Sequence, residues 1–232
     1  MMDAWRTDWA NNKENIAYKL NSGECGGSYG DAVLILCAVL SALAAEVWPG
    51  DGKDRKRFVE LLKEFAPQNF ETTKISIPLL IKSLSSAGRA DDVTVIQREF
   101  PKSQQGNVLT GEDDKTEGDI LRVCPALSSK DLRKCSYANL LYKEVRSPYV
   151  HEYRPGKRAD SRPMTQRPDV PVSYVGWIDP DPNNRDRDPE QRIYFTVEWI
   201  SRVATSIARA VDRAGSLPLP APSQWWVDGC SV

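Results

Sequence analysis

The chain has little of the chemistry from which metal sites are built, with one histidine and five scattered cysteines among 232 residues. No pair of cysteines has the CxxC spacing typical of zinc sites, so a zinc site within one chain is not expected. We expect neither a metal ion nor another cofactor. Cys37 and Cys135 lie within apolar helical patterns and are expected in the core. An odd number of scattered thiols favours a reducing, cytoplasmic location.

The chain also lacks an excess of charge of either sign, since its formal net charge is −1. Such a balance gives no global field that attracts nucleic acid or membranes, so a polyanion such as RNA must be held by a local patch. The longest uncharged apolar run covers residues 32–45, which is shorter than the roughly 20 residues of a membrane span. It predicts a buried core helix, and no membrane partner is expected. The polar first fifteen residues have no apolar segment of the kind found in secretory signals.

A glycine-rich phosphate loop is absent as well. The stretch NSGECGGSYG (21–30) lacks the GxxxxGK[ST] spacing of a P-loop, and no predicted strand precedes it. We interpret this stretch as a flexible connector rather than a phosphate site.

What the chain does contain is apolar residues at helical spacing. This pattern predicts helices over 1–20, 30–48, 54–66 and 195–214, with two shorter ones within 75–84 and 90–100. A further helix is predicted from a capping motif at Ser128 and Asp131 up to Arg146. Its apolar stripe consists of Leu132, Cys135, Ala138, Tyr142 and Val145. The polar segment 101–119 is predicted to be a mobile loop.

The region 155–192 differs in composition, because it holds seven prolines. Two β-prone runs, VSYVGWI (172–178) and RIYF (192–195), predict a hairpin. The tail is too rich in proline for a helix, and Trp225–Trp226 is expected to pack on the domain or on a partner. These patterns predict a mainly all-α fold, a single helical domain over 1–232 with a small β-hairpin insertion and a Pro/Trp-rich C-terminal tail.

The residues that carry chemistry are Arg146 and His151, the only histidine, in LLYKEVRSPYVHEYRPGKR (140–158). An imidazole exchanges protons near neutrality, and a guanidinium matches the oxygens of a phosphate. Together they suit attack of a ribose 2′-hydroxyl on its neighbouring phosphate, which in principle needs no metal. On an ideal helix the two side chains lie about 140° apart. Pro148 is expected to kink or end the helix near Ser147, which is one way to bring the pair together.

At this point the chain resembles the HEPN superfamily, through an R-x4-H motif at a helix end that LLYKEV precedes and HEY follows. The resemblance covers about two-thirds of the chain, with 67–127 and 155–192 as insertions into a helical bundle. It implies a metal-independent endoribonuclease, of a toxin or defence type, that forms a 2′,3′-cyclic phosphate. Arg146 would then hold the scissile phosphate or steady the reacting hydroxyl, His151 would be the general acid or base, and Ser147 would be the polar residue that follows the arginine.

A single imidazole has a consequence for assembly. In-line phosphoryl transfer gains from one group that removes a proton and another that donates one, so two imidazoles require two chains. We therefore expect a homodimer with both motifs in one cleft, as in the paired sites of the family.

Around the motif, the basic residues Arg154, Lys157, Arg158, Arg162 and Arg167 lie within 153–168 and are interpreted either as an RNA-steering loop or as a solvated surface. Tyr149 and Tyr153 flank His151 and are candidates to stack on a base or to pack in the core. An alternative function is a non-catalytic module that binds a nucleotide or a protein, which Pro148, the tail and the insertions favour. Expected partners are RNA, a second copy of the chain, and an antitoxin or regulatory protein.

Overall fold

The described part of the chain is mainly helical, as the sequence predicts. The computed structural model describes residues 4–101, 109–161, 170–177, 190–215, 222 and 225–228. Its longer helices are α1 (Trp5–Asn21), α2 (Tyr29–Val47), α3 (Asp54–Phe65), α4 (Ile77–Ser86), α5 (Ala90–Glu99) and α10 (Val197–Ala214). The shorter ones are α6 (Glu117–Val123), α7 (Ser129–Arg133), α8 (Tyr137–Leu140) and α9 (Ser147–Glu152). Single 3₁₀ turns are η1 (Glu24–Gly26), η2 (Gln68–Phe70), η3 (Gly111–Asp113) and η6 (Trp226–Asp228).

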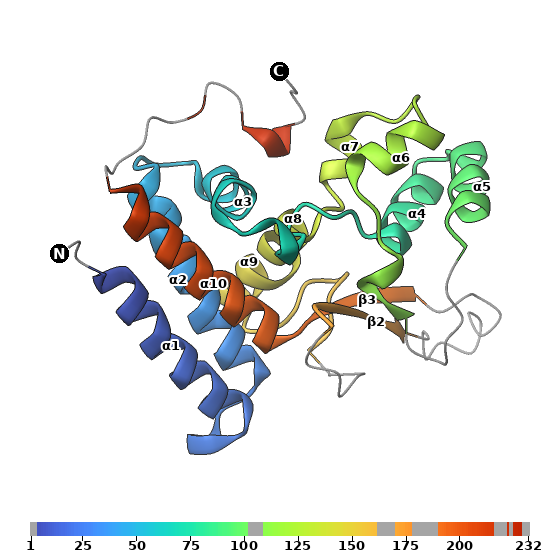
Figure 1. The fold of residues 1–232 in the computed structure, drawn as a ribbon. Helices are drawn as coiled ribbons and strands as arrows, with labels where there is room; N and C mark the ends of the chain where they lie inside the picture. The colour runs from blue at the N-terminus through green and yellow to red at the C-terminus, as the bar shows by residue number, and fades with distance from the viewer. Residues whose placement is uncertain are drawn as a thin grey trace.

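A helical bundle forms the larger of two hydrophobic cores. Helices α1, α2 and α10 run side by side, and α3, α8 and α9 complete the bundle around them (Figure 1). Helix α2 begins at a capping box in which Ser28 accepts from the backbone N–H of Asp31, while the Asp31 carboxylate accepts from the backbone N–H of Ser28. Cys37 is fully buried within it, so the prediction that this thiol lies in the core is confirmed.

Helix α2 is longer than the uncharged run from which it was predicted. It has 19 residues and a mean hydropathy of 2.0, so by length and composition alone it could cross a membrane. In the structure it is the central helix of the bundle, with α1 and α10 against it, yet only 56% of its apolar stretch is buried. The uncovered face carries Ile35, Ala38, Ala42 and Ala45, of which the first and last are half-buried and the other two exposed.

A second, smaller core lies among α4, α5, α6 and α7, on the opposite side of the molecule from α1 (Figure 1). Its buried residues fall between Ile75 and Cys135, and Cys135 is fully buried as predicted. The prediction of a mobile loop over 101–119 is wrong for the described residues 109–119. They form a two-residue strand, the turn η3 and the start of α6, which Thr116 caps by accepting from the N–H of Asp119.

The small sheet is antiparallel, and its buried side chains, among them Val172, Tyr174, Ile193 and Phe195, belong to the larger core. Strand β2 (Val172–Trp177) pairs with β3 (Glu190–Phe195), with Val172 opposite Phe195, so the predicted hairpin pairing is confirmed. The connecting segment 178–189 lies outside the described residues. Strand β1 (Leu109–Thr110) adds to the other edge of β2, which gives the order β1-β2-β3.

The predicted helix from Ser128 to Arg146 is divided in two. Ser128 caps α7 as predicted, but α7 ends at Arg133, and Ser136 caps a new helix by accepting from the N–H of Asn139. The predicted stripe is therefore split, because Leu132 and Cys135 belong to the smaller core while Ala138, Tyr142 and Val145 belong to the larger one.

The C-terminal tail packs on its own domain where it is described. The Trp225 ring lies edge-on to Trp48, with centroids 5.8 Å apart, and the backbone N–H of Trp226 donates to Glu60 at 2.8 Å. The Arg133 guanidinium covers the Trp226 ring at 4.9 Å and donates to the Trp226 carbonyl at 2.9 Å. The tail thus links α3 of the larger core to α7 of the smaller one.

Candidate functional site

The R-x4-H motif lies on one continuous helix that changes its winding. Helix α8 passes into a π-helical segment, η4 (Leu141–Arg146), and then into α9. The backbone of Arg146 and Ser147 is right-handed helical, and the N–H of Ser147 donates to the carbonyl of Tyr142, five residues back. Of the two outcomes expected at Pro148, a kink or an end of the helix near Ser147, the end is therefore wrong.

Pro148 is accommodated because another group serves the carbonyl that it leaves without a donor. Proline has no N–H, so the carbonyl of Glu144, four residues earlier, has no donor in the regular α-helical register. The backbone N–H of Gly156 donates to that carbonyl at 2.7 Å. Glycine is required there, since a Cβ on Gly156 would lie 2.5 Å from the Glu144 carboxylate. The loop after α9 thereby folds back onto η4.

Arg146 is half-buried and directed toward α2. Its Nε donates to the Ser41 hydroxyl at 3.2 Å, and its guanidinium lies 5.2 Å from the centre of the Tyr142 ring. Burial raises the pKa of the nearby Cys37 thiol to about 12, and the Arg146 charge opposes that rise. Arg146 is thus held between α2 and η4, at the border of the uncovered α2 face.

His151 is exposed and makes no hydrogen bond or ion pair with any described residue. Arg146 is the last residue of η4 and His151 lies in α9, and at α-helical spacing five positions correspond to about 140° of rotation. Because Arg146 faces α2, His151 is expected on another side of the helix, and no hydrogen bond joins the two side chains in the described structure. Ser147, one helical turn before His151, lies on the same side as the histidine.

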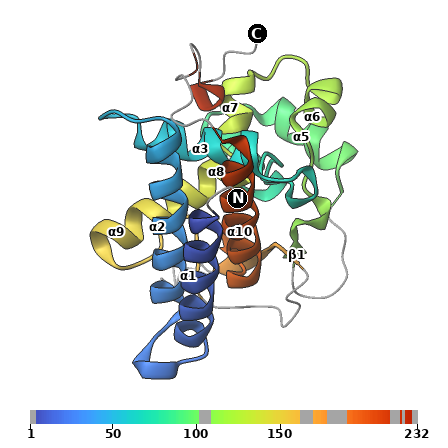
Figure 2. The same ribbon diagram turned by 60° about the vertical axis from the view of Figure 1, so that its left-hand side comes forward.

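Large apolar side chains are exposed on both sides of His151. Among the described residues, Val150 is 48% and Tyr153 58% exposed. Tyr153 ends α9 in a left-handed conformation, and its hydroxyl donates to the Asp31 carboxylate at the start of α2. This hydrogen bond lowers the pKa of Asp31 and raises that of Tyr153. Helix α9 lies at the outer edge of the bundle, beside α2 (Figure 2).

The structure does not leave Tyr149 free to stack on a base. Its side chain is only 4% exposed and packs edge-on against Tyr29 and Tyr153, with centroids 6.4 Å away in each case. Burial raises the pKa of Tyr149 to about 12. Its core-packing interpretation is the one that the structure supports.

The predicted basic loop divides into residues with different surroundings. Arg154 is exposed and paired with Glu152, and Lys157 is exposed without a partner among the described residues. Arg158 turns inward and binds the buried Glu144 carboxylate at 2.8 Å. Arg162 and Arg167 lie outside the described residues.

Arg158 and Ser147 take part in a pocket of about 340 Å³ that the sequence analysis did not anticipate. Four of its lining residues are cationic, namely Arg55, Lys134, Lys143 and Arg158. The other four are uncharged, namely Ser83, Asn139, Tyr142 and Ser147. The spacing of Asn139, Lys143 and Ser147 at intervals of four was a signal that they share a helix face. Arg55 and Ser83 come from distant segments, and nothing local in the sequence indicates them.

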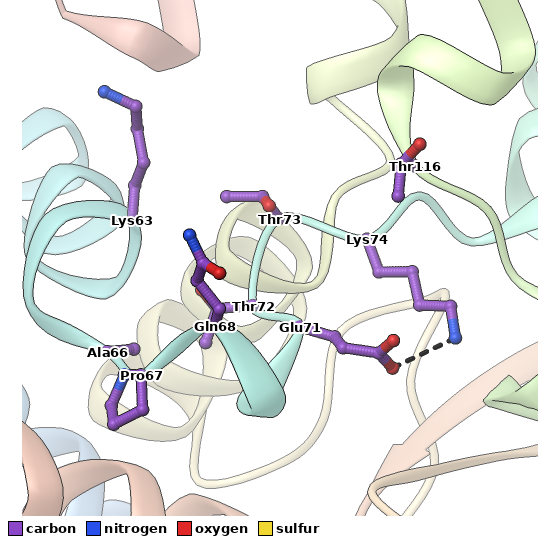
Figure 3. A pocket seen from close by; sticks show the side chains of 9 residues that line it. All are labelled: Lys63, Ala66, Pro67, Gln68, Glu71, Thr72, Thr73, Lys74 and Thr116. Atoms are coloured by element: carbon purple, nitrogen blue, oxygen red, sulfur yellow. Dashed lines mark hydrogen bonds and ion pairs between the residues drawn. The ribbon is translucent and has the colours of Figure 1, made fainter.

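A second pocket, of about 260 Å³, lies between the end of α3 and the start of α6. Its two lysines, Lys63 and Lys74, are on opposite sides of the opening, and Glu71 pairs with Lys74 (Figure 3). Lys63 is paired with Glu60 and Glu64. Because both cations are compensated, this pocket offers a weaker attraction for an anion than the first.

No cluster of three or more His, Cys, Asp or Glu side chains that could hold a metal ion occurs within the described ranges. Comparisons with models of known families, with curated proteins and with solved structures give no match. The function is therefore argued from the residues themselves.

Proposed function

We propose that the protein is a dimeric endoribonuclease that cleaves RNA without a metal, with Arg146 from one chain and His151 from the other at each site. The observation that carries this proposal is the exposure of Val150 on the helix surface between the two motif residues. A 48% exposed valine next to an exposed, unpartnered imidazole suits a surface that a second chain covers.

The positions along the helix fit a two-fold arrangement. Along the sequence, the midpoint between Arg146 and His151 is also the midpoint between Ser147 and Val150. A two-fold axis through that point would set two α9 helices antiparallel and place Ser147 against Val150 of the partner. The same axis would place Arg146 of each chain beside His151 of the other. The incompletely covered apolar face of α2, which borders Arg146, would extend this interface.

In such a site each group has a distinct role. Arg146, held by Ser41 and Tyr142, would bind a phosphate oxygen and offset the charge that develops in the transition state. His151 would remove the proton of the 2′-hydroxyl or donate one to the leaving 5′-oxygen, and the products would be a 2′,3′-cyclic phosphate and a 5′-hydroxyl. Ser147 would line the contact between the chains. This activity suits a cytoplasmic toxin or defence nuclease that an antitoxin or regulatory protein restrains.

Cleavage in the presence of EDTA tests this proposal. We expect the wild-type protein to cut a mixed RNA, and His151→Ala and Arg146→Ala to cut it roughly 100-fold more slowly or worse, as for loss of a general acid–base group. Arg202→Ala, which removes an exposed arginine of α10, is the matched control and keeps the wild-type rate. Equal rates of RNA decay for all four proteins would end the proposal.

A specific observation also favours the alternative, a non-catalytic module that binds a nucleotide. The basic pocket contains neither Arg146 nor His151. Ligand binding without any cleavage would favour that second function.

A further inference from the structure

The basic pocket concentrates positive charge that the protein does not neutralise. Of its four cations, Lys134 is paired with Asp131 and Arg158 with Glu144. Arg55 and Lys143 have no carboxylate partner within the described chain, and no carboxylate lines the pocket itself. Like charges held close together repel one another, so an arrangement of this kind is stabilised when an anion enters.

Arg55 is positioned by a buried amide rather than by a carboxylate. Its Nε donates to the Asn139 side-chain oxygen at 2.9 Å, and the Asn139 amide donates to the Lys134 carbonyl at 2.8 Å. Asn139 is 1% exposed, so its orientation is fixed by the surrounding backbone. An amide orients the guanidinium without reducing its charge, which leaves the remaining N–H groups of Arg55 available to a ligand.

On the other side of the pocket, Arg158 is also held in place by a buried side chain. Glu144 is buried and holds Arg158 through both its Nε and its second terminal nitrogen, each at 2.8 Å from the same carboxylate oxygen. Neighbouring Lys82 contacts Glu190, and its pKa is lowered by burial and then by the charges of Arg158 and Arg192. Positive potential therefore extends beyond the residues that line the pocket.

We infer that this pocket binds the phosphate group of a nucleotide or of an RNA strand. Guanidinium forks and ammonium groups suit phosphate oxygens, and the hydroxyls of Ser83 and Ser147 can supply further hydrogen bonds. A volume of about 340 Å³ lies within the range of about 300–1,000 Å³ for small-molecule pockets. The pocket therefore has room for more than the phosphate alone. The π-helical segment η4, which places Tyr142 and Lys143 on this wall, is a feature often found at functional sites.

Calorimetric titration of the full chain with AMP and, separately, with a short single-stranded RNA tests the inference. To keep the RNA intact, the titrations use His151→Ala as the background, since His151 is not part of this pocket. In that background, Arg55→Gln and Lys143→Gln should each weaken binding roughly tenfold, as for loss of one hydrogen bond to a charged group. Lys19→Gln, at an exposed lysine of α1, makes the same change of charge and should leave binding unaltered.

Titration with AMP and with RNA distinguishes a free nucleotide from a nucleic-acid strand as the ligand that carries the phosphate. Binding of AMP that both pocket variants weaken assigns the site to a free nucleotide, whereas binding of RNA alone assigns it to a nucleic-acid backbone. If neither probe binds, or if Lys19→Gln weakens binding as much as the pocket variants do, the inference is wrong. Binding here without RNA cleavage by the wild type would remove the proposed nuclease and leave the pocket standing.

Discussion

Asp114 is a carboxyl group buried beneath two tyrosine hydroxyls. Tyr137 and Tyr174 both donate to one of its oxygens, and the backbone N–H of Ile77 donates to the other at 2.9 Å. This cluster ties η3, α8, β2 and the start of α4 together. Burial is the largest influence on Asp114 and raises its pKa to about 6, against the opposing effect of these hydrogen bonds.

The raised pKa predicts the direction of a pH dependence. The folded protein holds the Asp114 proton more tightly than the unfolded chain does, so the stabilisation is complete below about pH 4. It is lost as the pH rises through about 6. A shift of two units corresponds to roughly 3 kcal/mol at most. We expect Asp114→Asn, which cannot ionise, to remove this component, so that the stability difference from wild type changes between pH 4 and 7.

Urea unfolding of both proteins at several pH values measures that difference, in which the contributions of other groups cancel. Parallel curves for wild type and Asp114→Asn would show that the carboxyl group does not titrate as its surroundings imply.

At the residue scale, contacts between residues close in the sequence could be predicted. Contacts between residues far apart in the sequence could not. The cap formed by Ser128 and Asp131 was predicted because both partners lie within one helical turn. The surroundings of Arg146 were not predictable, because Ser41 lies 105 positions away and only the packing of α2 against η4 brings it near. Asp114 was placed in a mobile loop because its polar neighbours give no sign of the tyrosines that cover it.

At the scale of elements, the helix that carries the motif depends on the loop that follows it. The close approach of Gly156 to Glu144 satisfies the carbonyl that Pro148 leaves free. It also positions the loop so that the backbone N–H of Arg158 donates to the Glu144 carboxylate at 3.3 Å. The side of the basic pocket that Arg158 forms therefore depends on glycine at position 156.

Substitution of that glycine tests the dependence. In Gly156→Ala the new Cβ would lie 2.5 Å from the Glu144 carboxylate and 3.0 Å from its Cα, which we expect to cost about 1–3 kcal/mol of folding free energy. Gly118→Ala is the matched control, because the nearest atom to its Cβ lies 3.9 Å away. Alanine within α6 should stabilise that variant by about 0.5–1 kcal/mol. Denaturant unfolding measures both, and equal stabilities would contradict the proposed close contact.

Most long helices were predictable, because their apolar spacing is a local property of the sequence. The break between α7 and α8 was missed for the same reason. Leu132, Cys135 and Ala138 keep helical spacing across it, and no proline or glycine marks it. The π-helical winding of η4 was also missed, since the apolar spacing of Ala138, Tyr142 and Val145 fits an ordinary α-helix.

At the scale of the whole molecule, two cores meet at the basic pocket. Arg55 comes from α3 of the larger core and Ser83 from α4 of the smaller core, while Asn139, Lys143 and Ser147 line the pocket from α8, η4 and α9. The Trp225–Trp226 tail joins the same two parts at another point. Ser147 both lines this pocket and belongs to the proposed contact between the chains, so a ligand in the pocket and a second chain on α9 are expected to influence one another.

The central claim is that each active site takes Arg146 from one chain and His151 from the other, and mixing two inactive variants tests it most directly. Arg146→Ala and His151→Ala are unfolded together, refolded as a mixture and assayed for RNA cleavage in EDTA. In a mixed dimer, one of the two sites combines the intact His151 of the first variant with the intact Arg146 of the second. We predict that the mixture regains about a quarter of wild-type activity, since half of the dimers are mixed and each has one intact site. A mixture as inactive as its two components would contradict the shared site.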